Sequence, residues 1–594
     1  MASKEVTDPA DPPTFRECRT RDVTSTDGVR LRVRESGVAG APTVVCVHGY
    51  PDNHTLWDGV TAELAPRYHL VSYDVRGAGE SGKPRERQAY RLDQLARDLA
   101  VVVEAVSPER PVHLMAHDWG AIACWHALSG QWLRGRVASY TSISGPDLDH
   151  VGHWLRARLR RPTPTALYQL ITQLMSSWYV GFFQLPLLPE LAWRAGLPQR
   201  ALARAEGAST PTVADGVNGI QLYRANMLPR LTRPSPQSVD VPVQVLAPGR
   251  DPFVSRSLQT DIGRWVPNLA VRELTSGHWL PRSHPRAVAR CASELIDHAE
   301  GGPEARTLRR ARRTGPGCGR FKDTLVVITG AGSGIGKATA LEFATRGAEV
   351  VVTDIDAQAA ERTARLASAL GPPANAYPVD VSNAAAVEKL GAVLLDAHGI
   401  PDIVINNAGI GVAGPFFDTT VADWERVIDV NLWGVIHGCR ILGGLLVDGG
   451  AGGTIVNIAS AAAYLPTRAL PAYATTKAAV LALSQCLRGE LAEAGIGVVA
   501  ICPGFVHTNI ANTTRFVGLD TAEEHATRRW ATEMYRWRNF TPERAAREIV
   551  RAVEHNTALA PITVEAKVGL LASRLTPGLL RALARAELAP RERH

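Results

Sequence analysis

Residues 325–336 read LVVITGAGSGIG, and this stretch decides the fold of the second half of the chain. The apolar and β-branched run Leu325–Thr329 predicts a buried strand, and the glycines after it predict a tight turn into a helix. Glycines at these spacings let a backbone approach a pyrophosphate at a helix N-terminus. Asp354 ends the next predicted strand, 18 residues after Gly336, where an acid can accept hydrogen bonds from ribose hydroxyls. The pattern predicts a dinucleotide site on a doubly wound parallel sheet.

Short β-branched runs alternate with helical patterns through most of the 594 residues. The clearest runs are Thr43–Val47, Leu70–Tyr73, Val112–Met115 and Val243–Ala247 in the first half, and Glu349–Thr353, Ile403–Ile405 and Thr454–Ile458 in the second. Such alternation predicts parallel sheets that are covered by helices on both faces. We therefore expect two α/β domains.

The domain boundaries follow from changes in composition. Residues 298–322 hold six Arg, five Gly and two Pro without apolar periodicity, which predicts a solvated linker between domains at 20–297 and 323–594. Between about 148 and 233 the strand–helix alternation gives way to aromatic-rich helical sequence. This segment predicts a helical insertion in the first domain.

In the first half, the sequence predicts a sharp strand-to-helix turn that carries a carboxylate. The strand Val112–Met115 runs into Ala-His-Asp-Trp-Gly, which places Asp118 between small flanking residues at a strand-to-helix turn. Such a turn exposes a nucleophile. Asp251 follows a later strand in Gly-Arg-Asp, and His278 follows in Gly-His-Trp. The order nucleophile, acid, histidine is that of the α/β-hydrolase fold.

With the loop His-Gly-Tyr-Pro at 48–51, these residues resemble the epoxide hydrolase branch of the α/β hydrolases over about 20–297. The resemblance implies that Asp118 attacks an epoxide carbon to form an ester, which water activated by His278 then hydrolyses, with Asp251 orienting the histidine. Backbone N–H groups of Tyr50 and Trp119 would hold the oxyanion.

The resemblance also implies two tyrosines of the helical cap that hydrogen-bond the epoxide oxygen. Tyr223 matches one of them, in Gln-Leu-Tyr-Arg-Ala-Asn. The other position is Phe182, which departs from the family pattern, and Tyr179 stands one helical turn away. The substitute for the missing tyrosine stays open on the sequence alone.

Two other interpretations of the first half stay open. Haloalkane dehalogenases also carry an Asp-Trp turn, but they place Asn or Glu where Tyr50 stands. A degenerate hydrolase domain that only binds lipid is the second alternative, and Phe182 favours it. Asp118 excludes a serine esterase.

The second half carries further motifs in a fixed order. They are Asn406-Asn407-Ala408-Gly409, Asn431, Asn457-Ile458-Ala459-Ser460, Tyr473-Ala474-Thr475-Thr476-Lys477 and Pro503-Gly504. Together with the glycine motif they strongly resemble the short-chain dehydrogenase/reductase family over 323–560.

The resemblance assigns a catalytic set. Tyr473 exchanges a proton with an alcohol or carbonyl oxygen, and Ser460 hydrogen-bonds that oxygen. Lys477, one helical turn from Tyr473, lowers the tyrosine pKa and holds the nicotinamide ribose. Asn431 positions a water in the proton relay. Lys477 is one of only seven lysines in an Arg-rich chain, which fits a position that needs a compact ammonium.

The cofactor is expected to be NAD(H) rather than NADP(H). Asp354 would repel a 2′-phosphate, and none of Ala331, Ser333, Ile355 and Asp356 is basic. The expected cofactor-binding residues are Gly330, Ser333, Gly334, Ile335, Gly336, Asp354, Asp380, Val381, Asn407, Lys477, Pro503 and Gly504.

Composition excludes several other classes of protein. Hydrophobic residues make up 45% and charged residues 21%, as in globular proteins. The net charge of +7 comes from 65 cations and 58 anions that are interspersed, so we expect no nucleic-acid partner. Eight cysteines without a Cys-x-x-Cys pair predict neither a disulfide framework nor a metal site.

The longest apolar run, Leu170–Trp193, is interrupted by Pro186 and Pro189, so we expect no transmembrane segment and a cytoplasmic protein. Residues 568–588 are amphipathic and basic. We expect them to pack on the domain or on a partner subunit, with weak contact to a membrane surface as the alternative. The dehydrogenase resemblance implies a homo-oligomer.

The whole chain resembles the EphD-type fusion of an epoxide hydrolase with a short-chain dehydrogenase. We therefore expect an N-terminal α/β-hydrolase fold with a helical cap and a C-terminal Rossmann doubly wound sheet. The expected function is bifunctional: epoxide hydrolysis to a diol, and NAD(H)-dependent alcohol oxidation or carbonyl reduction. The apolar content of the cap favours a lipophilic substrate; the residues are Trp178, Tyr179, Phe182, Phe183, Leu185, Leu187 and Leu188.

Overall fold

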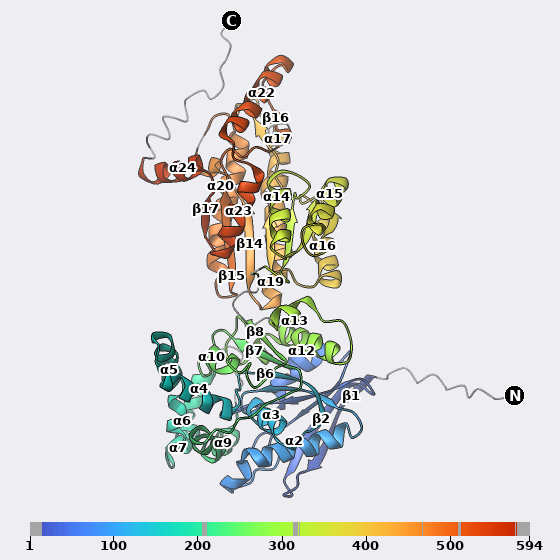
Figure 1. Cartoon of the computed structure of the whole chain (residues 1–594), viewed down its shortest axis with the longest axis vertical. Helices are drawn as coiled ribbons and strands as arrows, with labels where there is room; N and C mark the ends of the chain where they lie inside the picture. Colours follow the sequence, from blue (N-terminus) through green and yellow to red (C-terminus); the bar gives the residue numbers. More distant parts are fainter. Residues whose placement is uncertain are drawn as a thin grey trace, which may run out of the picture. The chain divides into compact units, whose positions relative to one another are not determined.

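The computed structural model divides the chain into two compact units, Met1–Thr314 and Gly315–His594 (Figure 1). It describes residues 15–204, 211–312, 319, 321–465, 467–508, 513–576 and 578. Each unit is an α/β domain, and each is described on its own below.

The first unit is built on an eight-stranded sheet in the order β1-β2-β4-β3-β5-β6-β7-β8. The strands are β1 (Phe15–Thr24), β2 (Arg30–Val38), β3 (Thr43–Val47), β4 (His69–Tyr73), β5 (Val112–His117), β6 (Val137–Ile143), β7 (Val243–Pro248) and β8 (Leu269–Leu274). The pairs β1–β2 and β2–β4 are antiparallel, and the remaining pairs are parallel. The carboxyl ends of β3 to β8 therefore share one edge, where His48, Asp118 and the loops after β7 and β8 meet.

Alternate residues of the central strands bury against opposite layers of helices, as the near-continuous apolar runs require. Val45 and Val47 of β3 belong to one core, while Val44 and Cys46 belong to the other. The helices are η1 (His54–Trp57), α1 (Asp58–Leu64), η2 (Arg87–Tyr90), α2 (Leu92–Val106), α3 (Trp119–Ser129), α10 (Arg256–Thr260), α11 (Leu280–Ser283) and α12 (Pro285–Ala299).

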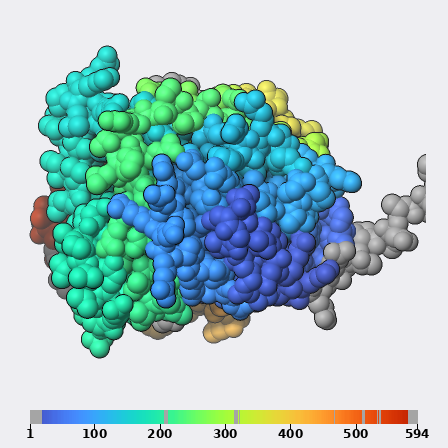
Figure 2. All heavy atoms as spheres, turned by 90° about the horizontal axis from the view of Figure 1, so that it is seen from below, coloured from blue at the N-terminus to red at the C-terminus, as the bar shows by residue number. Residues whose placement is uncertain are grey.

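The helical insertion lies between β6 and β7 and forms a cap. Its helices are α4 (Leu148–Arg160), α5 (Pro164–Ser176), α6 (Trp178–Phe182), α7 (Leu188–Arg194), α8 (Leu197–Leu202) and α9 (Val213–Thr232). Figure 2 shows the teal and green residues of this cap gathered on one side of the first unit, beside the blue N-terminal part. The apolar run Leu170–Trp193 is broken into parts of α5, α6 and α7, so it forms no continuous helix.

Part of the expected linker 298–322 is folded. Helix α13 (Arg306–Ala311) lies inside it, and Leu308 and Ala311 are buried with Ala270 of β8 and Leu295 of α12. The prediction of a solvated linker is wrong for this helix, because its two apolar residues are three apart and reach one core. Residues 313–318 and 320 of the expected linker lie outside the described residues.

The second unit is built on a seven-stranded parallel sheet in the order β11-β10-β9-β12-β14-β15-β17. The strands are β9 (Leu325–Thr329), β10 (Glu349–Asp354), β11 (Asn375–Pro378), β12 (Ile403–Asn406), β14 (Gly453–Ile458), β15 (Ile496–Cys502) and β17 (Leu559–Pro561). Strands β13 (Val412–Ala413) and β16 (Arg515–Phe516) pair separately. The chain turns from β11 back to the other side of β9, which makes a topological switch point between β9 and β12.

Helices cover both faces of this sheet. They are α14 (Gly334–Thr345), α15 (Ala357–Ser368), α16 (Ala384–Ala397), α17 (Val421–Ile428), η3 (Asp429–Trp433), α18 (Gly434–His437), η4 (Gly438–Leu442), α19 (Gly443–Gly449), η5 (Ala461–Ala463), α20 (Pro471–Glu490), α22 (Thr521–Arg538), α23 (Pro542–Glu554) and α24 (Val564–Leu575). Val326 and Ile328 of β9 face the core of α14 and α23, and Leu325 and Val327 face the core of α16 and α20. Residues 577 and 579–594, which include the end of the amphipathic segment, lie outside the described residues.

The segments α17 to α19 form one continuous helical run, Val421–Gly449, in which η3 and η4 are π-helical. Within the part of the chain that the structure describes, this run is the one helix long and apolar enough to span a bilayer. Length and composition alone are weak support for a span, and 44% of the apolar window is buried against the rest of the unit. A Cβ on Gly438 would lie 1.9 Å from Asn406 Oδ1, and a Cβ on Gly443 would lie 2.7 Å from Ile455 Cδ1, so the helix approaches the strands closely at these glycines. The run therefore packs as a core helix of the sheet.

Candidate active sites

The Asp118 turn has the geometry of a nucleophile elbow. Asp118 has φ 49° and ψ −122° between β5 and α3, a conformation that costs energy for a side chain with a Cβ. Two positions packed against this turn have room only for glycine. A Cβ on Gly120 would lie 2.4 Å from the carbonyl oxygens of Val47 and His48, and a Cβ on Gly145 would lie 2.2 Å from the backbone carbonyl oxygen of Asp118. The turn thus lifts the carboxylate above the sheet edge.

His278 links the two carboxylates. Its Nδ1 lies 3.0 Å from Asp251 Oδ2, and its Nε2 lies 3.9 Å from Asp118 Oδ1. Burial would lower the pKa of His278, but the charge of Asp251 and the hydrogen bond to it outweigh burial and leave this pKa above its ordinary value. Burial would raise the pKa of Asp251, and His278 reverses that shift. The structure thus brings together the nucleophile, acid and histidine that the sequence predicts.

The other oxygen of Asp118 lies in a cradle of backbone donors. The Tyr50 N–H donates to Asp118 Oδ2 at 2.8 Å, and the Trp119 N–H also donates to this carboxylate. Burial raises the pKa of Asp118 to about 6, while His278 and the two N–H groups act in the opposite direction. The cradle is the expected oxyanion site.

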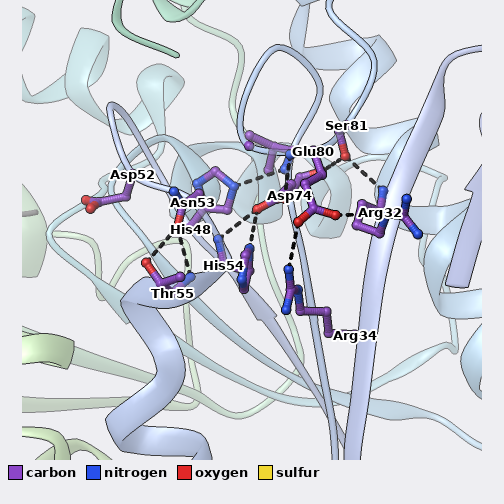
Figure 3. A network of polar contacts seen from close by, with 12 residues as sticks. Arg32, Arg34, His48, Asp52, Asn53, His54, Thr55, Asp74, Glu80 and Ser81 are labelled. Carbon is purple, nitrogen blue, oxygen red and sulfur yellow. Dashed lines mark hydrogen bonds and ion pairs between the residues drawn. The ribbon is translucent and has the colours of Figure 1, made fainter. Parts of the chain in front are cut away.

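The loop that carries Tyr50 is fixed by the buried Asp74, as Figure 3 shows. Asp74 Oδ1 accepts hydrogen bonds from the His54 N–H at 2.9 Å and from His54 Nδ1 at 2.8 Å, and Oδ2 accepts from the Glu80 N–H at 2.8 Å. The Val75 N–H donates to His48 Nε2 at 3.0 Å, so His48 carries its proton on Nδ1, which contacts the Gly49 carbonyl at 2.9 Å. This network holds the oxyanion loop against the end of β4.

Tyr179 and Tyr223 of the cap both face the carboxylate. Their ring centroids are 5.8 Å apart, and Tyr223 packs against Trp119 with centroids 4.9 Å apart. Burial raises the pKa of both phenols, the Asp118 charge adds to that rise, and a hydrogen bond with Tyr223 opposes it at Tyr179. Both phenols therefore stay protonated and can donate.

Phe182 occupies a different environment. Its ring contacts Trp178 and Phe183, with centroids 6.1 and 6.0 Å away, and it is half-buried in the cap core. The helical turn α6 (Trp178–Phe182) directs Tyr179 toward Tyr223, Phe183 and Phe253 instead. Tyr179 rather than residue 182 is thus the second phenol of the site.

Two buried polar residues that the sequence analysis missed support His278. The His117 Nε2–H donates to the His278 carbonyl at 2.9 Å, and burial lowers the pKa of His117 to about 3, so this imidazole stays neutral. Asp52 Oδ2 accepts a hydrogen bond from Trp279 Nε1 at 2.9 Å. Their positions next to Asp118 and in the His-Gly-Tyr-Pro-Asp loop were the available signals.

In the second unit, Tyr473, Ser460 and Lys477 converge beside the end of β14. Ser460 hydrogen-bonds the Tyr473 side chain, and Lys477 Nζ lies 5.8 Å from the Tyr473 ring centroid. Lys477 Nζ donates to the Ile458 carbonyl at 2.8 Å, and burial lowers its pKa to about 8. Burial raises the pKa of Tyr473 and exceeds the opposing effect of Ser460. The expected effect of Lys477 on the pKa of Tyr473 stays a prediction.

Asn431 lies fully buried in the π-helical turn η3. Its Oδ1 accepts from the Ile410 N–H at 2.8 Å, and its Nδ2 donates to the Ile410 carbonyl at 3.0 Å and to Thr476 Oγ1 at 3.3 Å. The side chain therefore ties the loop after β12 to α20. Its expected role in positioning a water stays a prediction.

The glycine loop fits a dinucleotide because side chains are excluded from it. A Cβ on Gly336 would lie 2.4 Å from Asn407 Nδ2, and one on Gly332 would lie 2.8 Å from Asp354 Oδ2. Gly330 has φ 62°, in the left-handed region. Asp354 Oδ2 accepts from the Gly332 N–H at 2.8 Å, which fixes the carboxylate beside the loop. The bare backbone at the start of α14 can approach a pyrophosphate.

The remaining predicted cofactor residues lie at the same sheet edge. Asn407 Nδ2 donates to the carbonyls of Thr329 and Gly330 at 3.0 and 2.9 Å. Asp380 Oδ1 accepts from Ser382 in the loop after β11, next to the buried Val381. Ser333 precedes α14, and Gly334, Ile335 and Gly336 form its first turn; Pro503 and Gly504 follow β15. The Gly504 N–H donates to Thr563 Oγ1 at 3.1 Å.

Comparisons with known proteins match each unit separately. The model of the short chain dehydrogenases matches residues 324–516, and the model of the alpha/beta hydrolase fold matches residues 42–285. Fold and sites thus define a hydrolase-fold domain joined to a short-chain dehydrogenase domain.

Relatives extend this match to the whole chain. Probable oxidoreductase EphD of Mycobacterium tuberculosis (strain ATCC 25618 / H37Rv) is 42% identical over 583 residues, which cover 95% of this chain and 98% of that protein. The chain belongs to the EphD family. The BbsD subunit of (2S)-[(R)-hydroxy(phenyl)methyl]succinyl-CoA dehydrogenase from Thauera aromatica is 40% identical over 188 residues, 32% of this chain and 75% of that protein. A short chain dehydrogenase/reductase from Burkholderia phymatum, solved in complex with NAD, is 31% identical with a TM-score of 0.41, covering 46% of this chain and 99% of that one.

The electrostatics of the first site predict how Asp118 titrates. We expect Asp118 to lose its proton near pH 6, because burial raises its pKa to about 6, and to be ionised above that pH. His278→Gln removes a positive charge that lowers the pKa, so the titration should move to higher pH. Difference infrared spectroscopy of the carboxyl band during a pH titration measures this, with Asp118→Asn as the matched control. A midpoint near 4 that His278→Gln leaves unchanged would contradict the electrostatics.

Proposed function

We propose that the first unit hydrolyses epoxides to vicinal diols through an ester of Asp118, and that the second unit is an NAD(H)-dependent dehydrogenase or reductase. One observation carries the first assignment: a buried carboxylate has one oxygen held by backbone N–H groups while the other faces His278, which Asp251 orients. A hydroxyl nucleophile would not need its own oxygen in the cradle, whereas an ester of Asp118 keeps its carbonyl oxygen there.

In the first step, Asp118 Oδ1 forms a bond to an epoxide carbon while the carbon–oxygen bond of the ring breaks. The leaving oxygen takes a proton from Tyr179 or Tyr223, whose phenols are kept protonated by burial and by the nearby carboxylate. The product is a hydroxyalkyl ester of Asp118.

In the second step, His278 Nε2 takes a proton from a water that attacks the carbonyl carbon of the ester. The negative charge that develops on the ester oxygen is held by the N–H groups of Tyr50 and Trp119. Asp251 stabilises the imidazolium. Collapse of the intermediate breaks the ester bond, and the leaving alkoxide takes the proton held by His278 to become the second hydroxyl of the diol. The other proton of the water, left on the Asp118 carboxyl, restores the phenol that was deprotonated in the first step.

The same geometry bears on the alternative functions. Two protonated phenols facing the carboxylate suit an epoxide oxygen, which needs a proton when it leaves, and therefore favour this reaction over dehalogenation. The intact contacts among Asp118, His278 and Asp251 favour a working site over a domain that only binds lipid.

In the second unit, the residues around Tyr473 handle the proton of the reaction. When bound, NAD(H) supplies or accepts the hydride. Tyr473 gives a proton to the carbonyl oxygen or takes it from the alcohol, and Ser460 hydrogen-bonds both that oxygen and the phenol. Lys477 holds the nicotinamide ribose, and Asn431 fixes the loop beneath it through Ile410. Asp354 accepts hydrogen bonds from the adenosine ribose.

The two reactions fit one another chemically. Opening an epoxide yields a vicinal diol, whose secondary alcohols are of the kind that a dehydrogenase of this family oxidises. Tyr179, Phe183, Tyr223 and Phe253 gather above the nucleophile and make the first site apolar, which supports a lipophilic substrate.

Covalent catalysis predicts that oxygen from water enters the enzyme. After a single turnover in heavy-oxygen water, label is expected in the Asp118 carboxylate, because water attacks the ester carbonyl there. In His278→Gln the ester should accumulate, seen by mass spectrometry as protein plus one substrate, since attack needs no imidazole but hydrolysis does. Asp118→Ala is the control without adduct. Labelled product with an unlabelled Asp118 over repeated cycles would refute the mechanism.

The paired phenols predict a shared role in protonation. Tyr179→Phe and Tyr223→Phe should each retain part of the epoxide turnover, and the double variant should lose at least about a hundredfold, because a general acid typically contributes that much. Phe182→Tyr is the matched control and should leave the rate nearly unchanged, since residue 182 points to Trp178. A fully active double variant would mean that another group donates the proton.

Asp354 predicts the cofactor preference. We expect kcat/KM to be at least about tenfold higher with NAD(H) than with NADP(H), since one repulsive charge pair near a partly buried site is worth about 1–3 kcal/mol. Asp354→Ala should narrow this ratio, and Ile355→Arg, at an exposed position just after the strand, should reverse it. Steady-state kinetics with both cofactors measures the ratio, and equal efficiency in the unmodified enzyme would refute the assignment.

A further inference from the structure

The cap exposes an unusual amount of apolar surface. Among the described residues of the first unit, every large apolar side chain that is exposed lies in the cap. These side chains are Leu159, Leu167, Tyr168, Ile171, Leu174, Met175, Trp178, Leu185, Leu187, Leu188, Leu191, Leu197, Val213 and Leu228. An exposed apolar area of this kind marks an interaction site in a folded protein.

The exposed side chains of α5 form one stripe. Leu167, Ile171 and Leu174 follow the three- and four-residue spacing of a helix face, with Tyr168 and Met175 beside them. The opposite side of α5 buries Leu170 in an apolar cluster with Trp154 and Leu258. It also buries Gln173, whose amide donates to the Phe253 carbonyl at 2.8 Å. These two contacts fix the helix to the domain, while most of its large apolar side chains are directed outward. Figure 1 shows α5 at the outer margin of the cap.

Four apolar cap residues that we expect from the sequence to favour a lipophilic substrate do not face the site. The side chains of Trp178, Leu185, Leu187 and Leu188 are exposed. They need a different explanation. We call the exposed apolar residues of α5 and α6, namely Leu167, Tyr168, Ile171, Leu174, Met175 and Trp178, the outer cap surface.

The charge of the cap is equally one-sided. Residues 148–233 contain ten Arg, no Lys and four acids, a net charge of +6 out of +7 for the whole chain. Three of the acids are paired: Glu190 with Arg224, Asp149 with Arg230 and Asp215 with Lys83. The exposed arginines of the cap include Arg160 and Arg161, which lie just before α5 in the chain, and Arg194 and Arg200 on α7 and α8. Arginines beside an apolar surface favour a partner whose surface is negatively charged.

The outer cap surface adjoins the active site. Trp178 is exposed on α6, and the next residue, Tyr179, faces Tyr223 above Asp118. Phe182 bridges the two environments, because its ring contacts both Trp178 and Phe183. A molecule that is bound on the outside of α6 thus lies one side chain away from the reacting groups.

We propose that the outer cap surface docks the enzyme on a bilayer of anionic lipid. A leucine-, tryptophan- and tyrosine-rich helix face flanked by arginines is what a membrane interface binds: the apolar side chains enter the acyl boundary and the guanidinium groups meet phosphates. A second copy of this chain would bring the same arginines together, which like-charge repulsion opposes. This inference goes beyond the proposed reactions and does not depend on them.

The test is flotation of the full-length protein with lipid vesicles. We expect binding to vesicles of phosphatidylcholine with phosphatidylglycerol, weak binding to phosphatidylcholine alone, and loss of binding at high salt. The double change Tyr168→Ser and Met175→Ser, at side chains that are 71% and 72% exposed, should weaken binding by more than about tenfold. Arg160→Gln with Arg161→Gln should weaken binding by at least about fivefold. Leu366→Ser with Leu370→Ser, at exposed positions of the second unit, is the matched control and should bind like the unmodified protein.

Three outcomes would overturn the proposal. Equal binding to neutral and anionic vesicles would remove the role of the arginines. Loss of binding only in Val568→Ser with Leu571→Ser would assign the contact to the exposed face of α24. Conversion of a dimer to a monomer by the Tyr168 and Met175 changes, without vesicle binding, would assign the surface to a second copy. The melting temperature of each variant checks that it is folded, and the flotation result does not depend on whether any epoxide is turned over.

Discussion

A buried carboxylate without a full countercharge is the constraint on which the first unit depends. Asp118 lies at the end of a central strand, where burial alone would keep it protonated and therefore unreactive. Two backbone N–H groups and the imidazole of His278 oppose that effect. Each of these donors is itself held in place: Tyr50 by the Asp74 network, Trp119 by the glycine-lined elbow, and His278 by Asp251 and the neutral His117.

The second unit handles a buried charge of the opposite sign in a related way. Lys477 is an ammonium that burial pushes toward neutrality, and the Ile458 carbonyl at the end of a strand stabilises its charged form. In both units the chemistry lies at the carboxyl edge of parallel strands, because there the backbone groups end their pairing and become available to ligands. The strands supply a rigid and apolar floor, and the loops supply the polar groups.

Much of this arrangement could be predicted from the sequence. Motifs that are local in the chain and tied to a strand end, such as the Asp118 elbow and the glycine loop with Asp354, lie where their patterns place them, because parallel strands align their carboxyl ends. The second phenol could not be assigned, since the choice between Tyr179 and residue 182 depends on how the short helix α6 rotates in the cap. The direction of the Lys477 ammonium likewise depends on a carbonyl 19 residues away in the chain. The outward direction of the cap leucines could not be predicted either, because an apolar helix normally buries its apolar face.

Helix α13 has a practical meaning for anyone who wishes to study the two reactions apart. A gene fragment that stops at residue 297, where composition alone would end the first unit, removes Leu308 and Ala311 and leaves Ala270 and Leu295 open to water. Uncovering a fully buried leucine and its contacts costs about 2–3 kcal/mol, a sizeable share of the stability of an ordinary domain. Such a fragment would be prone to aggregate, and an inactive preparation of it would say nothing about the chemistry of Asp118. A fragment that extends through residue 312 keeps Leu308 and Ala311 packed on Ala270 and Leu295.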